Sequence, residues 1–192
     1  MRRGSKLLIL LGLLLILGSI GAFVTARILA NKAGTEARDT VSRLRELLPE
    51  KRPGMQDRYT DMQMPVLQLD GRDLVAIVEI PGFGTELPVR NSWNPGTLHN
   101  SPCRYWGTCY DGSLIIGGSS QPGQFDCFGQ LQPGASVRLT DMTGAVFTYT
   151  VTRIDRAASA APEKLTGGEA QLTLFTRDPY TLDYILVRCS LG

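Results

Sequence analysis

The sequence is poor in the groups from which metal centres and acid–base sites are usually built. It holds one histidine, His99, among 192 residues, which excludes any multi-histidine metal site and leaves few groups that titrate near neutral pH. The four cysteines lack Cys-x-x-Cys spacing and the acidic residues are scattered, so we expect no metal and no cofactor. The sequence also has no Gly-x-Ser-x-Gly motif, which argues against one common type of serine hydrolase.

Charge of one sign is equally scarce. The chain has 20 Lys and Arg residues and 18 Asp and Glu residues, for a net charge of +2, and this near-neutral balance does not favour nucleic acid as a partner. Hydrophobic residues make up 43% of the chain and charged residues 20%, a composition inconsistent with disorder. The length fits one domain with an appendage.

The appendage begins with an apolar segment. Residues 7–26 carry no charge and are mostly Leu, Ile, Gly and Ala, and about 20 helical residues span a bilayer core of about 30 Å. Three basic residues lie within residues 1–6, so the positive-inside rule predicts a cytoplasmic N-terminus, a single-pass anchor in the cell membrane and an extracellular C-terminal domain. A cleaved signal peptide is the alternative, because residues 24–26 resemble a cleavage site.

Residues 27–65 are predicted to form a stalk helix and a linker. Apolar residues recur at helical spacing between Val41 and Leu48, with charged residues between them, which indicates an amphipathic helix over residues 35–48 that packs on the domain. Pro49 ends this helix. The polar stretch that follows, with its Pro-Gly pair, is typical of a linker.

Residues 66–192 are predicted to form the folded domain, and its fold class is mainly β. Short runs rich in Val, Ile, Thr and aromatic residues are separated by turns that contain Pro and Gly. Many short strands without alternating helices favour a closed β-barrel with short helices over a parallel α/β sheet. The strands are expected at residues 74–80, 85–89, 113–116, 136–140, 146–154, 171–175 and 184–187.

Several of these runs, taken in order, resemble the sortase family. Residues 78–84 and 87–89 are similar to its opening strands, residues 114–119 to the strand that ends at the catalytic histidine, and residues 172–180 to the strand that normally ends in Thr-Cys. The resemblance implies a sortase-like barrel over about residues 74–191. Sortases are cysteine transpeptidases on the outer face of Gram-positive cells, where they cut a sorting signal and join the protein to the cell wall or a pilus.

The resemblance also implies that the three catalytic groups have been replaced. The histidine position falls on Ser119, the cysteine position on Arg177 and the arginine position on Asp183. A guanidinium stays protonated and cannot attack a carbonyl, a serine does not take up a proton as an imidazole does, and an aspartate would repel a developing oxyanion. We therefore expect no catalytic residue at these positions. Because Arg177 and Asp183 bracket a short turn, we expect them to pair across facing strand ends.

The cysteines are the remaining candidates for chemistry. Cys103 and Cys109 enclose five residues of a predicted extracellular loop, and this spacing permits either a disulfide or two free thiols. Cys127 and Cys189 are expected to be small buried residues, with a bond between them as the alternative. A dyad of His99 with Cys103 stays open, because spacing does not show whether the two side chains face each other.

Aromatic residues are frequent in the segment before the strand at residues 113–116. They form either a surface patch for a peptide or a glycan, or packing at the core and its rim. The residues concerned are Trp93, Tyr105, Trp106 and Tyr110.

These features favour a membrane-anchored extracytoplasmic pseudo-sortase that acts in binding or scaffolding at the cell envelope. Its expected partner is a sorting-signal peptide, a pilin or a true sortase, because a barrel can keep its shape after its chemistry is lost. The first alternative is an active sortase-type transpeptidase or hydrolase that uses a displaced cysteine, which requires a sulfur within about 4 Å of an imidazole nitrogen. The second alternative is a purely structural envelope protein.

Overall fold

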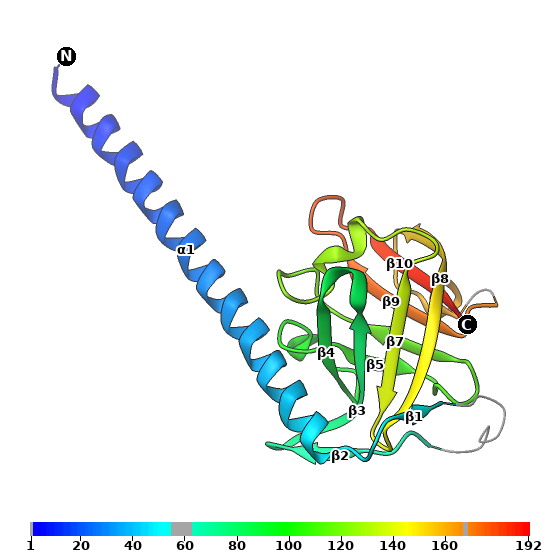
Figure 1. Ribbon diagram of the computed structural model, residues 1–192. Helices are drawn as coiled ribbons and strands as arrows, with labels where there is room; N and C mark the ends of the chain where they lie inside the picture. Colours follow the sequence, from blue (N-terminus) through cyan, green and yellow to red (C-terminus); the bar gives the residue numbers. More distant parts are fainter. Residues whose placement is uncertain (1, 55–62, 167–168) are drawn as a thin grey trace.

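The structure, a computed structural model, describes residues 2–54, 63–166 and 169–192, with side chains described outside residues 2–8, 26–33 and 162–163. One long helix, α1 (Arg2–Leu47), projects from a β-rich domain, and its C-terminal end lies against the strands (Figure 1). Four shorter helical segments lie between strands of the domain. They are η1 (Pro81–Phe83), η2 (Pro95–Thr97), η3 (Asp126–Gly129) and α2 (Pro162–Leu165).

Eight strands close into a barrel, which confirms the predicted fold class. The ring runs in the order β8, β10, β9, β6, β5, β4, β3 and β7, and β7 returns to β8. The two remaining strands, β1 and β2, extend its edges by pairing with β8 and β3. The strands are β1 (Arg52–Pro53), β2 (Leu67–Leu69), β3 (Arg72–Ile80), β4 (Thr85–Arg90), β5 (Cys103–Trp106), β6 (Leu114–Gly117), β7 (Ser136–Asp141), β8 (Ala145–Ala157), β9 (Leu172–Arg177) and β10 (Tyr184–Leu191).

The seven predicted strands are all present, and the others were missed. β5 lies in a segment predicted to be a loop. It was missed because four residues with one Arg next to aromatic side chains show no clear alternation of apolar and polar residues. β1 and β2 have two and three residues. Such short strands carry too few positions for a period of two to be visible.

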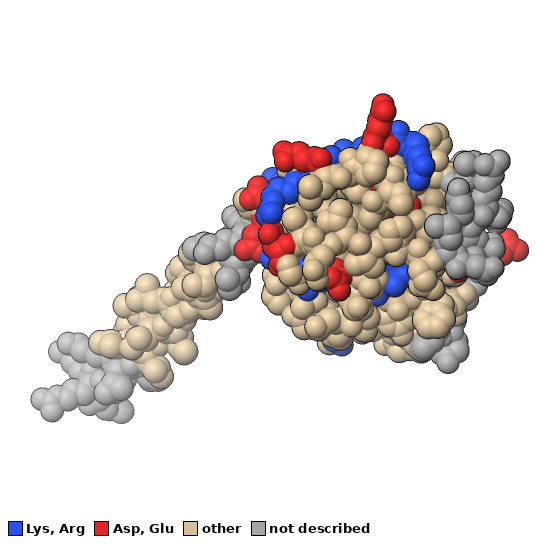
Figure 2. Space-filling model, turned by 90° about the horizontal axis from the view of Figure 1, so that it is seen from below, with Lys and Arg blue, Asp and Glu red and all other residues tan. Residues whose placement is uncertain are grey.

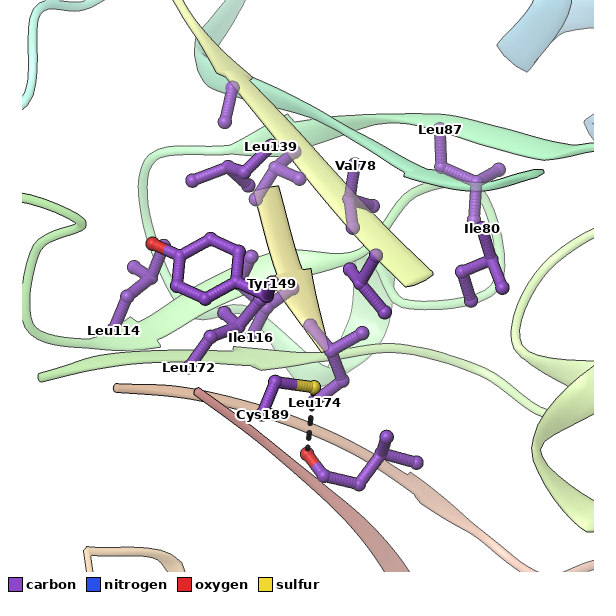
Figure 3. Packing of buried hydrophobic residues seen from close by; sticks show 14 of the residues in the cluster. Val78, Ile80, Leu87, Leu114, Ile116, Leu139, Tyr149, Leu172, Leu174 and Cys189 are labelled. Carbon is purple, nitrogen blue, oxygen red and sulfur yellow. Dashed lines mark hydrogen bonds between the residues drawn. The ribbon is translucent and has the colours of Figure 1, made fainter. Parts of the chain in front are cut away.

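The barrel interior is filled by the inward-facing side chains of nearly every strand. On β9, Leu172 and Leu174 face inward, as do Leu114 and Ile116 on the parallel strand β6. Tyr149 of β8 is fully buried among them (Figure 3). Removal of apolar surface from water, at about 25 cal/mol per Å², drives this packing.

The end of α1 is attached to the barrel through a separate apolar contact. Val41 and Leu44 point toward β2 and β3 and pack with Leu69, Leu74 and Ile77. This is the amphipathic face that the sequence predicted for the stalk helix. The contact fixes the last turns of α1 against the outer side of the barrel.

Charged groups strengthen the same attachment around one buried carboxylate. The Glu79 side chain, on β3, is only 8% exposed and accepts from Arg45 of α1 at 3.1 Å and from Arg138 of β7 at 2.6 Å. Arg45 also contacts Glu86 of β4. A buried carboxylate is tolerated only when it is paired and hydrogen-bonded, so loss of Arg45 would leave Glu79 under-compensated. Charged side chains gather where α1 meets the barrel, whereas most of the adjoining face is uncharged (Figure 2).

The chain leaves α1 through a tightly packed segment. The Arg52 amide donates to the Gly144 carbonyl at 3.0 Å, and the Gly54 amide donates to the Val146 carbonyl at 2.7 Å. A Cβ at Gly54 would lie 2.7 Å from the ring of Phe147, so only glycine fits there. Residues 55–62 of the predicted linker lie outside the described residues.

The N-terminal organisation differs from the prediction. The sequence predicted a transmembrane helix at 7–26 and a separate stalk helix at 35–48, but α1 runs without a break from Arg2 to Leu47. No proline lies within this range. Between the two predicted helices the one glycine is Gly34, and a single glycine costs a helix only about 1 kcal/mol relative to Ala. Among the residues that the structure describes, no helix is long and apolar enough to cross a membrane, so the predicted transmembrane helix is not supported.

We expect Leu44→Ala to lower the free energy of unfolding by about 2–5 kcal/mol, because it empties a fully buried site between α1 and the barrel. The matched control is Leu47→Ala in the same helix, whose side chain is 58% exposed and which we expect to change stability by less than about 0.5 kcal/mol. Chemical denaturation followed by tryptophan fluorescence measures both. Equal effects of the two variants would contradict the docking of α1.

Candidate functional site

The ends of β6 and β9 form the candidate site. Two of the positions that by resemblance correspond to sortase catalytic residues, Ser119 and Arg177, lie at or just beyond these strand ends. β6 and β9 run parallel with Gly117 beside Phe175. The Gly118 amide donates to the Phe175 carbonyl at 2.9 Å, and Thr176 Oγ1 donates to the Gly118 carbonyl at 3.0 Å. Continued by two residues, the register of β6 and β9 would set Ser119 opposite Arg177, the last residue of β9.

Two glycines allow the chain to leave β6 at this point. A Cβ at Gly117 would lie 2.5 Å from the rings of both Phe175 and Trp93, and a Cβ at Gly118 would lie 2.5 Å from the ring of Phe125. Real Cβ atoms do not approach ring carbons so closely, so the glycine pair is required by neighbouring aromatic side chains.

Asp183 is next to the site along the chain but lies outside the strand pair. In the antiparallel ladder Tyr184, the first residue of β10, is the residue opposite Arg177, so the ladder does not set Asp183 across from Arg177. The predicted ion pair between Arg177 and Asp183 is wrong, since no such pair within 4.0 Å occurs among the described residues. Arg177 Nε instead donates to the Leu182 carbonyl at 3.1 Å.

The turn between β9 and β10 is held by Asp178. Its carboxylate accepts from Arg156 at 2.7 Å and from the Tyr180 amide at 2.9 Å. The hydrogen bond from Arg156, helped by backbone amides, lowers the pKa of Asp178 to about 2. Leu182 adopts a positive φ of 65°, which is strained for a residue other than glycine. The turn therefore has a defined shape and presents Tyr180, which is 93% exposed.

No disulfide closes the segment between Cys103 and Cys109, so that predicted alternative is wrong: each of the four cysteines carries a thiol. Cys103 is the first residue of β5, where it pairs with Gly117 and its sulfur lies 3.7 Å from Thr97 Oγ1. Cys109 instead belongs to the barrel core. The strand carries the two sulfurs to different environments, which the spacing alone did not reveal.

The thiols are all buried. Cys127 and Cys189 are buried, as predicted, and are not bonded to each other. The sulfur of Cys189 lies inside the barrel beside Leu174 (Figure 3). Burial raises the pKa of Cys189 to about 12 and also raises the pKa values of Cys109 and Cys127. A thiol must ionise and be reached to react, and these thiols meet neither condition.

The single imidazole is also away from any thiol. His99 is exposed, and its backbone carbonyl accepts a hydrogen bond from Gln124 Nε2 at 3.0 Å. The Cys103 sulfur, which is completely buried, contacts the Thr97 hydroxyl and the Ser101 carbonyl. The dyad of His99 with Cys103 therefore does not form within the described part of the chain.

A cluster of aromatic side chains covers the outer face of β6 and β9 beside the site. Trp93 and Tyr105 contact Phe175 with ring centroids 5.6 Å apart in each pair, and Tyr184 lies 6.2 Å from Phe175. We call these four residues the outer aromatic cluster. Phe175 is buried, whereas Trp93, Tyr105 and Tyr184 are half-buried. Tyr184 and Phe175 were not singled out from the sequence, although strand alternation places both on the face of Arg177.

The other two aromatic residues of the predicted patch lie apart from this cluster. Tyr110 is buried and donates its hydroxyl to Asp141 at 2.6 Å, which makes it part of the core. Trp106, by contrast, is 64% exposed. Tyr110 of the predicted patch is therefore core packing, whereas Trp106 is exposed and lies outside the outer aromatic cluster.

Arg188 holds a segment over the same outer face. It is 5% exposed, and its guanidinium donates to the Leu165 carbonyl at 2.5 Å, to Thr173 at 3.0 Å and to Asp155 at 3.4 Å. Leu165 of α2 packs with Phe175. The segment around α2 thus covers part of the outer face and leaves the end near Arg177 exposed.

Two cavities in the described part of the chain lie away from this site. One of about 250 Å³ is enclosed between the end of α1 and the barrel, lined by Arg45, Ile77 and Thr140 among others. Another of about 140 Å³ lies between Arg38 and Glu86. Neither is lined by Ser119, Arg177 or Asp183. Within the described residues no group of three or more His, Cys, Asp or Glu side chains could hold a metal ion.

The native thiols should resist alkylation. We expect the folded protein at pH 7.5 to react with iodoacetamide at least about 100-fold more slowly than a free thiol, and all four cysteines to be labelled after denaturation without reductant, since burial blocks the thiolate. Arg177→Cys is the control, because a thiol at this exposed position should be labelled quickly in the folded state. Mass spectrometry counts the labels. One fast native cysteine, or fewer than four labels after denaturation, would contradict the assignment.

The turn held by Asp178 should loosen in acid. Because the folded-state pKa is about 2 and the unfolded value is about 3.9, the ionised carboxylate contributes stability above about pH 4, and this contribution disappears as the pH falls from about 4 to 2. We expect amide exchange at Tyr180 and Thr181 to accelerate in this window, as measured by NMR. In Asp178→Asn the acceleration should be absent, and its persistence there would refute the role of the carboxylate.

The comparisons with known proteins agree on the fold. No protein-family model and no curated protein matches the sequence, but the structure is similar to many solved sortases. Sortase A from Corynebacterium diphtheriae aligns with a TM-score of 0.53 and 17% identity, over 85% of this chain and 84% of that chain. Sortase C-3 from Streptococcus pneumoniae gives 0.56 and 17%, over 85% and 83%. A variant of sortase E from Streptomyces avermitilis gives 0.52 and 24%, over 62% and 87%. With the closed eight-stranded barrel, these alignments show that the chain has a sortase-like fold.

Proposed function

We propose that this chain is a catalytically inactive sortase-like protein that binds an extended peptide at the cell envelope. Its favoured ligand is a sorting-signal peptide, free or as part of a pilin. The observation that carries the proposal is the guanidinium of Arg177 at the end of β9, beside Ser119. By resemblance, a sortase has its thiol and its imidazole at these two positions.

The loss of transpeptidase chemistry follows from the replaced groups. Acyl transfer requires a nucleophile that gives up its proton and later leaves. A guanidinium has no acceptor and stays protonated in proteins, so Arg177 cannot form an acyl intermediate. The Ser119 hydroxyl accepts from the Gln121 amide, and within the described residues it has no hydrogen bond to a basic side chain that could take its proton.

The surroundings of the site support binding in place of chemistry. The turn at residues 178–183 is fixed by Asp178, and it exposes Tyr180 and Leu182, the latter 56% exposed. Exposed aromatic and aliphatic side chains on a rigid turn lose little conformational entropy when a peptide packs on them. A peptide can therefore use this end of the barrel even though nothing there can cut it.

An active enzyme with a displaced cysteine finds no support in the thiol environments. Cys103 and Cys109 are both completely buried, and the imidazole of His99 is exposed on another segment. A purely structural role is favoured by a different feature, the cover that α2 and Arg188 place over the outer face. The two roles differ in one measurable property, since only the binding protein captures peptide.

The proposal places the domain at the membrane surface. The described side chains of residues 9–25 are largely apolar and exposed, with Leu14 at 62% and Leu15 at 67%. A continuous exposed apolar surface of this kind requires an apolar partner. Lipid is the partner that the uncharged composition of residues 7–26 favours.

The test mixes the full chain, in detergent micelles, with a sorting-signal peptide that carries a fluorophore at one end and a quencher at the other. We expect saturable binding by fluorescence anisotropy and no increase in emission over 24 h, because no residue can attack the scissile carbonyl. Scrambled peptide is the control for binding. Cleavage that iodoacetamide abolishes would overturn the proposal in favour of an active enzyme, and absence of binding would favour the structural role.

A further inference from the structure

The terminal guanidinium nitrogens of Arg177 are the donors of a further candidate site. Its Nε is occupied by the Leu182 carbonyl, and this bond fixes the plane of the guanidinium. Among the described residues no partner is found for its two terminal nitrogens, which lie on an exposed side chain. A fixed guanidinium with two free nitrogens has the fork geometry that binds a carboxylate through two parallel hydrogen bonds.

Ser119 adds a second donor beside it. The Ser119 hydroxyl oxygen accepts from the Gln121 amide at 3.2 Å, which leaves the hydroxyl hydrogen free to donate. The register of β6 and β9, continued by two residues, sets Ser119 opposite Arg177, and the site requires the Ser119 hydroxyl to lie on the same outer face as the guanidinium. A carboxylate held by the guanidinium would thus lie within reach of a hydroxyl donor.

The acidic residues nearby do not neutralise this position. Asp178 and Asp183 are adjacent to each other, with the Asp178 amide donating to the Asp183 carbonyl at 2.7 Å, and among the described residues neither carboxylate forms an ion pair with Arg177 within 4.0 Å. The Asp178 carboxylate is already bound to Arg156. On the outer face, Asp155 is bound to Arg153 and Arg188. Arg177 therefore presents an uncompensated positive charge.

Beside this charge lies an apolar floor. Tyr184 is directly opposite Arg177 on β10, and Phe175 is two residues before it on β9. The half-buried rings of Trp93 and Tyr105 continue the surface. Aromatic rings at the rim of a charged donor contact the body of a ligand while its anionic end reaches the donor.

We propose that the end of β9 is a carboxylate-binding site, in which Arg177 and Ser119 hold the carboxylate and the outer aromatic cluster contacts the apolar group attached to it. The occupant is a peptide with a free C-terminal carboxylate. This inference rests on the proposed peptide binding and deepens it, because it states which end of a peptide is read. A carboxylate is the product of hydrolysis of a peptide bond, so the site would favour cleaved peptides over intact ones.

The first experiment uses 3-phenylpropionate as a probe and 3-phenylpropionamide as its uncharged match. NMR follows the Arg Nε–Hε signals of the full chain in micelles while each compound is added. We expect the signal of Arg177 to shift with the acid and to remain still with the amide. We expect affinity for the acid to fall at least tenfold between 20 mM and 500 mM salt, because an exposed ionic contact is screened.

Two variants test the assignment. Arg177→Gln removes the charge and should weaken binding of the acid at least tenfold, whereas Arg153→Gln, an exposed arginine on the same face of β8, should leave it within twofold. Thermal melting confirms that both variants are folded. Equal binding of acid and amide, or equal binding by Arg177→Gln and the unaltered protein, would overturn the carboxylate site.

Peptides separate this inference from the proposed function. Acetylated tetrapeptides of apolar residues are prepared with a free carboxylate, with a C-terminal amide, and with an internal Glu and a C-terminal amide. We expect the free carboxylate to bind at least tenfold more tightly than the other two. If only the peptide with the internal Glu binds strongly, the site recognises side-chain carboxylates, and the proposed recognition of a C-terminal carboxylate is wrong. If sorting-signal peptides bind without any preference for a carboxylate, the proposed function stands and this inference fails. If only the carboxylates bind, the inference stands and the sorting-signal ligand is wrong.

Discussion

The parallel pairing of β6 with β9 is the constraint on which the candidate site depends. These strands are distant in sequence, yet Gly117 and Phe175 lie side by side, and the bond from Thr176 to the Gly118 carbonyl extends the contact past the end of β6. Only glycine fits at 117 and 118, because aromatic rings close over both positions. The same two glycines therefore let Trp93 and Phe175 pack over the end of β6, next to the strand end that carries Arg177.

The attachment of α1 depends on apolar packing and on a buried carboxylate. Apolar packing of Val41 and Leu44 supplies the favourable free energy, and the buried carboxylate of Glu79 specifies where the helix lies, because it needs the cations of Arg45 and Arg138. The helix end is thus docked on the β3 and β4 side of the barrel, away from β9. A ligand at Arg177 and the α1 contact use separate parts of the molecule.

The sequence predicted what depends on local pattern and missed what depends on which way a side chain points. Runs of β-branched residues predicted seven strands. The closed barrel was predicted because these strands are many and short and no helices alternate with them. The segment from Cys103 to Cys109 was open between a disulfide and free thiols, and it contains a strand, because β5 is too short to show alternation. Asp183 was predicted to pair with Arg177 across facing strand ends. The ladder instead puts Tyr184 opposite Arg177, and no local pattern encodes that register.

A change of one residue at the end of β9 has different consequences for fold and for chemistry. The fold depends on the inward-facing Leu172 and Leu174 and on Thr176, none of which is altered by the identity of residue 177. The proposed chemistry depends on residue 177, the exposed last residue of β9. Guanidinium and thiolate carry opposite charges, so under the proposal a position that by resemblance holds an attacking anion in a sortase would attract an anion in this chain. Such an exchange would leave the core of the barrel unchanged, because fold and site are separable.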